Sequence, residues 1–175
     1  MISRASKHNP ICKNVEGGTF HSFAYKILKR YAKALDFPET MFILDEGDAE
    51  AAVHRCATRL GFYEREKRFP KKDTLRTIIS MSINKRMSIG EVIKKEYPHF
   101  REYVADIQNL RREYAEYKIN KNYLDYDDLL VYLKILLEND EIRKGLSNRY
   151  RYVMIDEYHF AAQLNAPPSA QISAP

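Results

Sequence analysis

Two adjacent carboxylates, Asp156 and Glu157, follow a run of β-favouring residues at 150–155 (Y-R-Y-V-M-I). Such a run is typical of a core strand that is buried on both faces, and it would place both acids at the end of that strand. There the first carboxylate can hold Mg²⁺, directly or through water, and the second can orient and deprotonate an attacking water. The pair therefore indicates nucleotide hydrolysis, although an apolar run before two acids also fits a strand that enters a solvated turn.

Three further acids stand close together in residues 124–130 (L-D-Y-D-D-L-L). Asp125 is a good helix cap, and Asp127 and Asp128 would lie in the first helical turn, where the helix dipole favours negative charge. These local roles explain the segment fully, so we do not predict a catalytic site here.

Three segments resemble, in the same order, motifs of the UvrD/PcrA/Rep group of superfamily 1 DNA helicases. Residues 18–24 (G-T-F-H-S-F-A) resemble the family's element beside the DNA groove, and residues 124–130 resemble its L-D-F-D-D-L-L element. Residues 153–158 (V-M-I-D-E-Y) resemble the motif that binds Mg-ATP. The likeness covers roughly residues 14–158, and three ordered motifs are hard to obtain by accident. It implies part of an N-terminal ATP-binding motor domain that carries a helical insertion.

The resemblance implies roles for four side chains. Asp156 would bind Mg²⁺ together with ATP, and Glu157 would be the catalytic carboxylate. Thr19 and His21 become candidates for phosphate or sugar contacts with single-stranded DNA, because a hydroxyl and an imidazole can both donate hydrogen bonds to phosphate. The simpler interpretation is that Thr19 caps a helix and that the neighbouring phenylalanines fill the core.

Two departures from the family limit what this chain is expected to do alone. A glycine-rich G-K-T loop, whose backbone amides and lysine hold phosphates, is nowhere in the sequence. After Tyr158 the family has Q-D-T, whereas residues 159–161 are H-F-A here. We therefore expect a fragment of an ATP-dependent 3′–5′ DNA helicase that binds neither ATP nor Mg²⁺ tightly and is inactive alone. A G-x-G-K-T segment encoded just upstream of Met1 would confirm that a longer helicase has been truncated.

The elements that must position these residues are mostly helical. Apolar residues recur at helical spacing, and the longest amphipathic segment runs over 100–120. Asp45 and Ser88 are the predicted caps of two further helices. The predicted helices span 23–35, 46–60, 74–86, a short segment after Ser88, 100–120, 124–137 and 140–146.

Strands are predicted near 14–18 and 150–155, and the resemblance implies that they meet in one small parallel sheet. The expected fold class is an α/β fragment, a mostly α-helical insertion subdomain flanked by a few parallel strands of a P-loop NTPase (RecA-like) core. The expected divisions are a partial core at 1–35, the helical insertion at 36–148, a core strand with the two acids at 149–158, and a flexible tail unlike the family at 159–175.

Charge and composition fit a nucleic-acid partner. The 175 residues carry a net charge of +5, which suits a polyanion. Two cysteines without a C-x-x-C pair and five scattered histidines argue against a disulfide framework or a structural zinc site, and a reducing cytoplasm fits best. No apolar run approaches the ~20 residues of a membrane span, so we expect no membrane partner. The sequence predicts no particular protein partner.

A different class of function stays open from the sequence alone. A stand-alone helical module would bind nucleic acid with no nucleotide role, through the basic residues Lys67, Arg68, Lys71, Lys72, Lys85, Arg86, Lys94 and Lys95. In either case we expect weak, salt-sensitive binding to single-stranded DNA, because phosphate contacts release counterions. A third alternative is a decayed gene product without a function.

Overall fold

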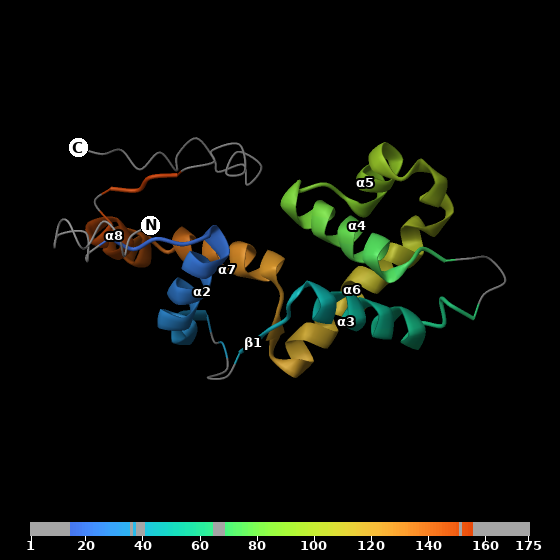
Figure 1. Cartoon of the computed structure of the whole chain (residues 1–175), viewed down its shortest axis with the longest axis horizontal. Coiled ribbons are helices and arrows are strands. Elements are labelled where there is room, and N and C mark those ends of the chain that lie inside the picture. Colours follow the sequence, from blue (N-terminus) through green and yellow to red (C-terminus); the bar gives the residue numbers. More distant parts are fainter. Residues whose placement is uncertain (1–14, 36, 38–40, 65–68, 151, 156–175) are drawn as a thin grey trace.

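The computed structural model describes residues 15–35, 37, 41–64, 69–150 and 152–155, and these are mostly helical (Figure 1). The α-helices are α2 (Phe20–Arg30), α3 (Glu46–Arg59), α4 (Lys72–Asn84), α5 (Ile89–Glu96), α6 (Val104–Lys121), α7 (Tyr126–Glu138) and α8 (Asp140–Arg149). The other described elements are the 3-10 helices η2 (Ala32–Leu35) and η3 (Pro98–Tyr103) and the strands β1 (Phe42–Ile43) and β2 (Tyr123–Leu124).

Two apolar clusters divide the described residues into two lobes that lie beside each other (Figure 1). The α3–α6 lobe comprises α3, α4, α5, η3 and α6, and its core includes the fully buried Val53, Ile78 and Leu110. The α2–α7–α8 lobe comprises α2, η2, α7 and α8, with Leu28 and Leu136 in its core. Each lobe therefore has an apolar core of its own, in which full burial of one aliphatic side chain contributes about 1.5–3 kcal/mol to stability.

Local capping sets where several helices begin, as predicted. The Asp45 carboxylate accepts a hydrogen bond from the backbone N–H of Asp48 at 2.8 Å and starts α3. Ser88 starts α5 with a reciprocal capping box, in which Ser88 and Glu91 each accept a hydrogen bond from the other's backbone N–H. Such caps satisfy backbone donors that have no partner within the helix.

The single helix predicted over 100–120 is instead two elements, η3 and α6. Phe100 has φ −101° and ψ 17°, outside the helical region, and Pro98 starts η3 on a separate tight turn. The break brings the rings of Phe100 and Tyr103 together, with centroids 6.4 Å apart, and Tyr103 is buried in the core of the lobe.

The strands predicted near 14–18 and 150–155 are not formed in the described parts of these segments. A strand requires a hydrogen-bonded neighbour, and no described strand pairs with either segment. The parallel pair of the structure is β1 with β2, in which Phe42 lies opposite Tyr123. This pair joins the two lobes at the point where the chain passes between them (Figure 1).

Side chains nevertheless join the first segment to the start of the second. The Glu16 carboxylate accepts hydrogen bonds from Arg149 Nη2 at 2.8 Å and from the Tyr150 hydroxyl at 3.0 Å. The ring of Tyr150 also meets Phe23 of α2 edge to face, with centroids 5.4 Å apart. Contact between the segments is thus seen at Glu16 and Tyr150, whereas the predicted sheet between them is wrong for the described residues.

The packing of α7 and α8 bears on the expected division of the chain. Both helices belong to the apolar cluster of α2, and α7 packs closely along α2 (Figure 1). These contacts group α7 and α8 with α2 and set the α3–α6 lobe apart from them. The expected insertion at 36–148 includes α7 and most of α8, and its boundary at residue 148 stays a prediction about the family's domains. None of the described helices is long and apolar enough to cross a membrane.

Candidate functional site

Thr19 caps α2, the helix that carries the first motif. Its Oγ1 accepts a hydrogen bond from the backbone N–H of Ser22 at 3.2 Å, and the Ser22 hydroxyl donates to the Thr19 carbonyl oxygen at 2.8 Å. Gly18 precedes this turn, and a Cβ at that position would collide with Ser22 Oγ, which explains the glycine. Thr19 is exposed, and its hydroxyl hydrogen is still available because Oγ1 is only an acceptor in the cap.

His21 brings the first motif into contact with the second. Its imidazole meets the ring of Tyr126, the first residue of α7, edge to face, with centroids 5.4 Å apart and planes at 61°. His21 is half-buried and Tyr126 is 43% exposed, so the two rings form part of the surface. Phe20 was expected in the core but is 37% exposed, because the apolar face of α2 is formed by Ala24 and the residues one turn further on.

The predicted nucleotide residues, Asp156 and Glu157, lie outside the described residues, so the structure places neither of them. Within the described ranges no three metal-ligating side chains gather into a group that could hold a metal ion. The described part of the chain therefore offers no Mg²⁺ site of its own, and no catalytic geometry follows from it.

The second motif contains the capping box that starts α7. Asp125 Oδ1 accepts a hydrogen bond from the backbone N–H of Asp128 at 3.0 Å, and Asp128 Oδ2 accepts one from the backbone N–H of Asp125 at 2.9 Å. This confirms the predicted capping role of Asp125. Capping does not explain the whole motif, however, because Asp125 and Asp127 are both buried.

Asp125 receives two further donors from α6. The Tyr114 hydroxyl donates to Asp125 Oδ2 at 2.8 Å, and Lys118 Nζ donates to the same oxygen at 2.9 Å. Lys118 Nζ also donates to Asp128, so one ammonium bridges both members of the capping box. Only 7% of the Lys118 side chain is exposed, so this pairing is largely withdrawn from water.

Asp127 receives three donors from one face of α4. Arg76 Nη1 donates to Oδ2 at 2.7 Å, while Ser80 Oγ and Asn84 Nδ2 donate to Oδ1 at 3.0 and 2.9 Å. The three donors are spaced four residues apart, which places them on a single stripe of the helix. We call the whole group the buried charge cluster; its members are Arg76, Ser80, Asn84, Tyr114, Lys118, Asp125, Asp127 and Asp128.

Pairing within the buried charge cluster shifts several pKa values. Burial acts to raise the pKa of Asp125, but Lys118 and Arg76 outweigh burial and hold this pKa below its usual value. Burial, followed by repulsion from Asp125, raises the pKa of Asp128. Burial acts to lower the pKa of Arg76, yet the carboxylates of Asp127 and Asp125 raise it above its ordinary value. Asp125 and Arg76 are therefore both charged at neutral pH.

The sequence did contain a signal for this cluster. Arg76, Ser80 and Asn84 form a polar stripe at four-residue spacing on a helix whose other buried positions include Leu75 and Ile79. A polar stripe on the buried side of a helix indicates a polar partner across the interface, because buried polar groups are almost always hydrogen-bonded. The partner itself, at residue 127, is not identifiable from local spacing.

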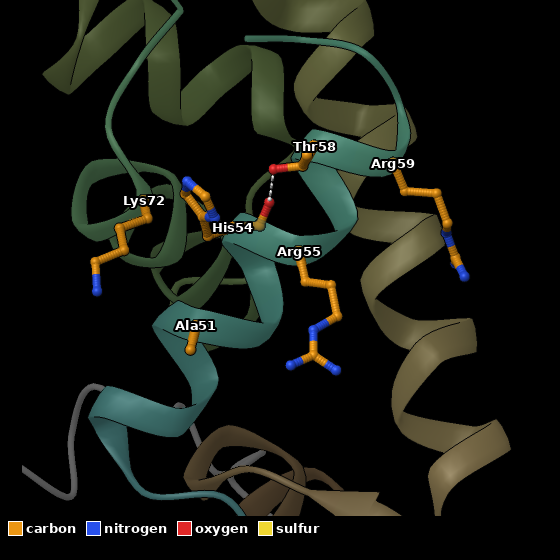
Figure 2. Close-up of a pocket in the computed structure, with 6 residues that line it drawn as sticks. All are labelled: Ala51, His54, Arg55, Thr58, Arg59 and Lys72. Carbon is orange, nitrogen blue, oxygen red and sulfur yellow. Dashed lines mark hydrogen bonds between the residues drawn. The ribbon is translucent and has the colours of Figure 1, made fainter.

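A second charged region lies on the outer face of α3 (Figure 2). It is a shallow depression of about 690 Å³, and Figure 2 shows cationic side chains of α3 and the start of α4 around it; the lining residues are Ala51, His54, Arg55, Thr58, Arg59 and Lys72. An adjoining depression shares His54 and Lys72 and adds Lys71, the acids Glu50 and Asp73, and Tyr63, whose ring stacks on His54 with centroids 4.9 Å apart. We call the two together the basic depression.

The cations of the basic depression are paired too, but they are more exposed to water than those of the buried charge cluster. Lys72 lies 3.3 Å from a Glu50 carboxylate oxygen, and Arg59 pairs with Glu113. The exposed fractions of the Lys72 and Arg59 side chains are 48% and 61%, so water screens both pairs.

The basic residues of the alternative function are spread over several places. Lys71 and Lys72 lie in the basic depression, and Lys67 and Arg68 are outside the described residues. Lys85 pairs with Glu96 at 3.2 Å. The remaining three, Arg86, Lys94 and Lys95, are exposed on or beside α5.

Comparison with known proteins adds to this geometry. The sequence profile of the UvrD/REP helicase N-terminal domain matches residues 1–161. The chain belongs to this family. The match includes residues 1–13, before the first motif, and stops three residues beyond Tyr158, so the segment 162–175 lies outside it.

Similar proteins include DNA helicase II of Rickettsia typhi, 29% identical over 154 residues, which are 86% of this chain and 23% of that protein. The ATP-dependent DNA helicase PcrA of Bacillus subtilis is 28% identical over 147 residues, covering 80% of this chain and 18% of PcrA. The ATP-dependent DNA helicase Rep of Escherichia coli is 27% identical over 141 residues, covering 80% and 20%. The chain thus spans about a fifth of the length of these relatives.

Proposed function

We propose that this chain is part of the N-terminal motor region of an ATP-dependent 3′–5′ DNA helicase that works in the cytoplasm. One observation supports a DNA-binding role beyond sequence similarity. His21 of the first motif lies against Tyr126 of the second, so two motifs far apart in the sequence meet at one partly exposed surface. A single strand of DNA can reach both rings there.

Thr19 and His21 are proposed to bind this strand. The Thr19 hydroxyl hydrogen and the imidazole N–H can donate to phosphate or sugar oxygens. The exposed rings of Phe20 and Tyr126 beside them offer flat faces on which bases can stack. Such contacts are tolerant of sequence, and their phosphate part weakens steeply with salt.

A nucleotide role is proposed for Asp156 and Glu157. Asp156 would bind Mg²⁺, and Glu157 would accept the proton of an attacking water. The bound Mg²⁺ would neutralise charge on the phosphates. Two carboxylates repel a triphosphate unless amides and a lysine hold it, and no G-K-T loop stands in these 175 residues. We therefore expect neither ATP binding nor hydrolysis by the chain alone.

Titration of a labelled single-stranded oligonucleotide at two salt concentrations tests the DNA contact. His21→Ala is expected to weaken binding about two- to tenfold, the loss of roughly one hydrogen bond. His99→Ala, at an exposed histidine of η3 in the other lobe, is the matched control and should bind like the unchanged chain. Absence of binding at low salt, or equal binding by both variants, would contradict the proposal.

Calorimetry with ATP tests the nucleotide role. The 175-residue chain should show no binding at micromolar concentration. In a longer protein that includes a G-K-T loop and the later helicase motifs, Glu157→Gln should abolish turnover and spare ATP binding, because the carboxylate acts on water. ATP hydrolysis by the 175-residue chain itself, lost in Glu157→Gln, would overturn the expectation that it has no working site.

A second candidate function is a stand-alone helical module that binds nucleic acid without a nucleotide role. The basic depression favours it, because exposed cations beside the stacked rings of His54 and Tyr63 suit a phosphate backbone. The double variant Lys71→Gln, Lys72→Gln tests it in the same titration. If this variant abolishes binding while His21→Ala leaves binding unchanged, the second function is supported and the first loses its DNA contact.

A further inference from the structure

We propose that Arg76 and Lys118, both on the α3–α6 lobe, are positioning residues for the DNA-contact element at the start of α2. They act through the first turn of α7, which they hold from two directions, and through Tyr126, which touches His21. The inference rests on the proposed function, in which His21 meets DNA. It assigns to the α3–α6 lobe a part in setting the geometry of a contact made on the other lobe.

Arg76 provides the first hold. Its guanidinium donates to Asp127 at 2.7 Å, and Nη2 lies 3.7 Å from Asp125, so one side chain of α4 spans both acids. Only 12% of the Arg76 side chain is exposed. A planar guanidinium fixes the direction as well as the distance of a carboxylate, which a point charge does not.

Lys118 provides the second hold, from α6. Its ammonium lies between Asp125 and Asp128 and contacts a carboxylate oxygen of each. Because Asp127 is held by α4 and Asp128 by α6, the first turn of α7 can neither rotate about its axis nor slide along it without breaking an ion pair. Two cations from two helices thus fix the orientation of this turn.

Tyr126 carries this orientation to α2. It stands between the held acids Asp125 and Asp127, and its ring points away from the cluster to meet His21. Successive residues of a helix point in directions about 100° apart. A small rotation of the first turn of α7 therefore moves the Tyr126 ring off the imidazole of His21.

A purely structural role does not account well for this arrangement. Well-packed apolar side chains in place of a buried ion group are often neutral or stabilising, so stability alone does not require these charges. Charged groups that form directed hydrogen bonds fix a single orientation of the helices that they join. That orientation matters where α7 meets the DNA-contact element.

The test uses the double variant Arg76→Gln, Asp127→Asn of the 175-residue chain, which removes both charges and leaves two amides that can still pair. The readout is the ¹H–¹⁵N spectrum of the histidine rings, in which the His21 signal is assigned by its loss in His21→Gln. Tyr126→Ala gives the position of this signal without a ring neighbour. Arg143→Gln, at an exposed ion pair of α8, is the control.

In the double variant the His21 signal should move from its normal position towards that of Tyr126→Ala, and single-stranded DNA should bind at least about twofold more weakly. A double variant that folds, as judged by its thermal melting, with an unmoved His21 signal and unchanged DNA affinity overturns the positioning role. Arg76→Lys keeps the positive charge but replaces the planar guanidinium with an ammonium, so the His21 signal should move less than in the double variant. If the double variant fails to fold, Arg76→Lys decides the question.

Failure of the proposed function is separately visible. If the unchanged chain does not bind single-stranded DNA, the DNA role of His21 is overturned whatever the ring signals do. If the chain binds DNA and the His21 signal ignores both Arg76 variants, only the positioning inference is overturned.

Discussion

The buried charge cluster and the basic depression are both built from cations of the α3–α6 lobe, but water reaches them very differently. In the cluster, Arg76 and Lys118 are surrounded by carboxylates and nearly inaccessible. In the depression, Arg59 and Lys72 have partners too, yet about half of each side chain faces solvent. The same kind of charged group is thus enclosed by carboxylates in one place and open to solvent in the other. Burial, rather than residue type, separates the two regions.

The largest expected effect is on stability, at the cluster. Asp127→Ala leaves Arg76 with only the more distant carboxylate of Asp125, 3.7 Å away, and removes the shared acceptor of Ser80 and Asn84. We expect a loss of about 3–5 kcal/mol in the free energy of unfolding, the usual result of breaking a buried ion pair. Urea unfolding followed by circular dichroism measures this. A loss below ~1 kcal/mol would place the cluster with surface pairs and remove the contrast between the two regions.

A smaller loss is expected where only a hydroxyl is removed. Tyr114→Phe keeps the ring in the core and deletes the donor to Asp125. Hydrogen bonds to a charged group contribute about 1.5–3 kcal/mol, so the free energy of unfolding should fall by that amount. Tyr63→Phe, at the basic depression, is the matched control and should be close to neutral, because Tyr63 is exposed. Equal losses in the two variants would contradict the comparison.

Acid should act on the cluster through Asp125. The pKa of Asp125 is lowered in the folded state, so the stability it contributes is complete above the pKa of an unfolded aspartate, about 3.9, and is lost as the pH falls through the lower folded value. Asp125→Asn should therefore flatten the fall of the unfolding free energy at acid pH. The pKa of Asp128 is raised in the folded state, so its effect on stability has the opposite sign. Asp128→Asn should therefore not flatten the fall of the unfolding free energy at acid pH.

The smallest effect on stability is expected at the basic depression. Arg55 is exposed, and among the described residues it donates to the Tyr117 hydroxyl at 3.5 Å, so Arg55→Gln should change the unfolding free energy by no more than about 0.5 kcal/mol. If the depression binds phosphates, the same change should lower the salt dependence of DNA binding by about one counterion. A variant that loses stability without a change in salt dependence would make Arg55 a structural residue.

Local relations in the sequence predicted the caps correctly. Thr19, Asp45, Ser88 and Asp125 each cap through a backbone N–H three residues ahead, and such partners are visible in the sequence itself. The order of the motifs predicted the family correctly for the same reason, because motif residues can be compared without knowing their contacts.

Long-range pairing could not be predicted from the sequence. Arg76 and Asp127 are 51 residues apart, and nothing in local spacing connects them. The strand predicted over 150–155 failed in the same way, since apolar β-branched residues favour a strand only where a neighbouring strand supplies hydrogen bonds. The described part of this segment is not in the sheet, and Tyr152 and Met154 are exposed.

The β1–β2 pair has a topological consequence. It holds Phe42 beside Tyr123, so the chain sets out towards the α3–α6 lobe and returns from it at the same point. Because the two strands are parallel, a connection that replaced the lobe would have to cross back from the end of β1 to the start of β2 and could not be a tight hairpin turn. Excision would also remove Arg76 and Lys118 and leave the acids of α7 without cations. Those acids would then lie in water in the first turn of α7, where the helix dipole still favours negative charge.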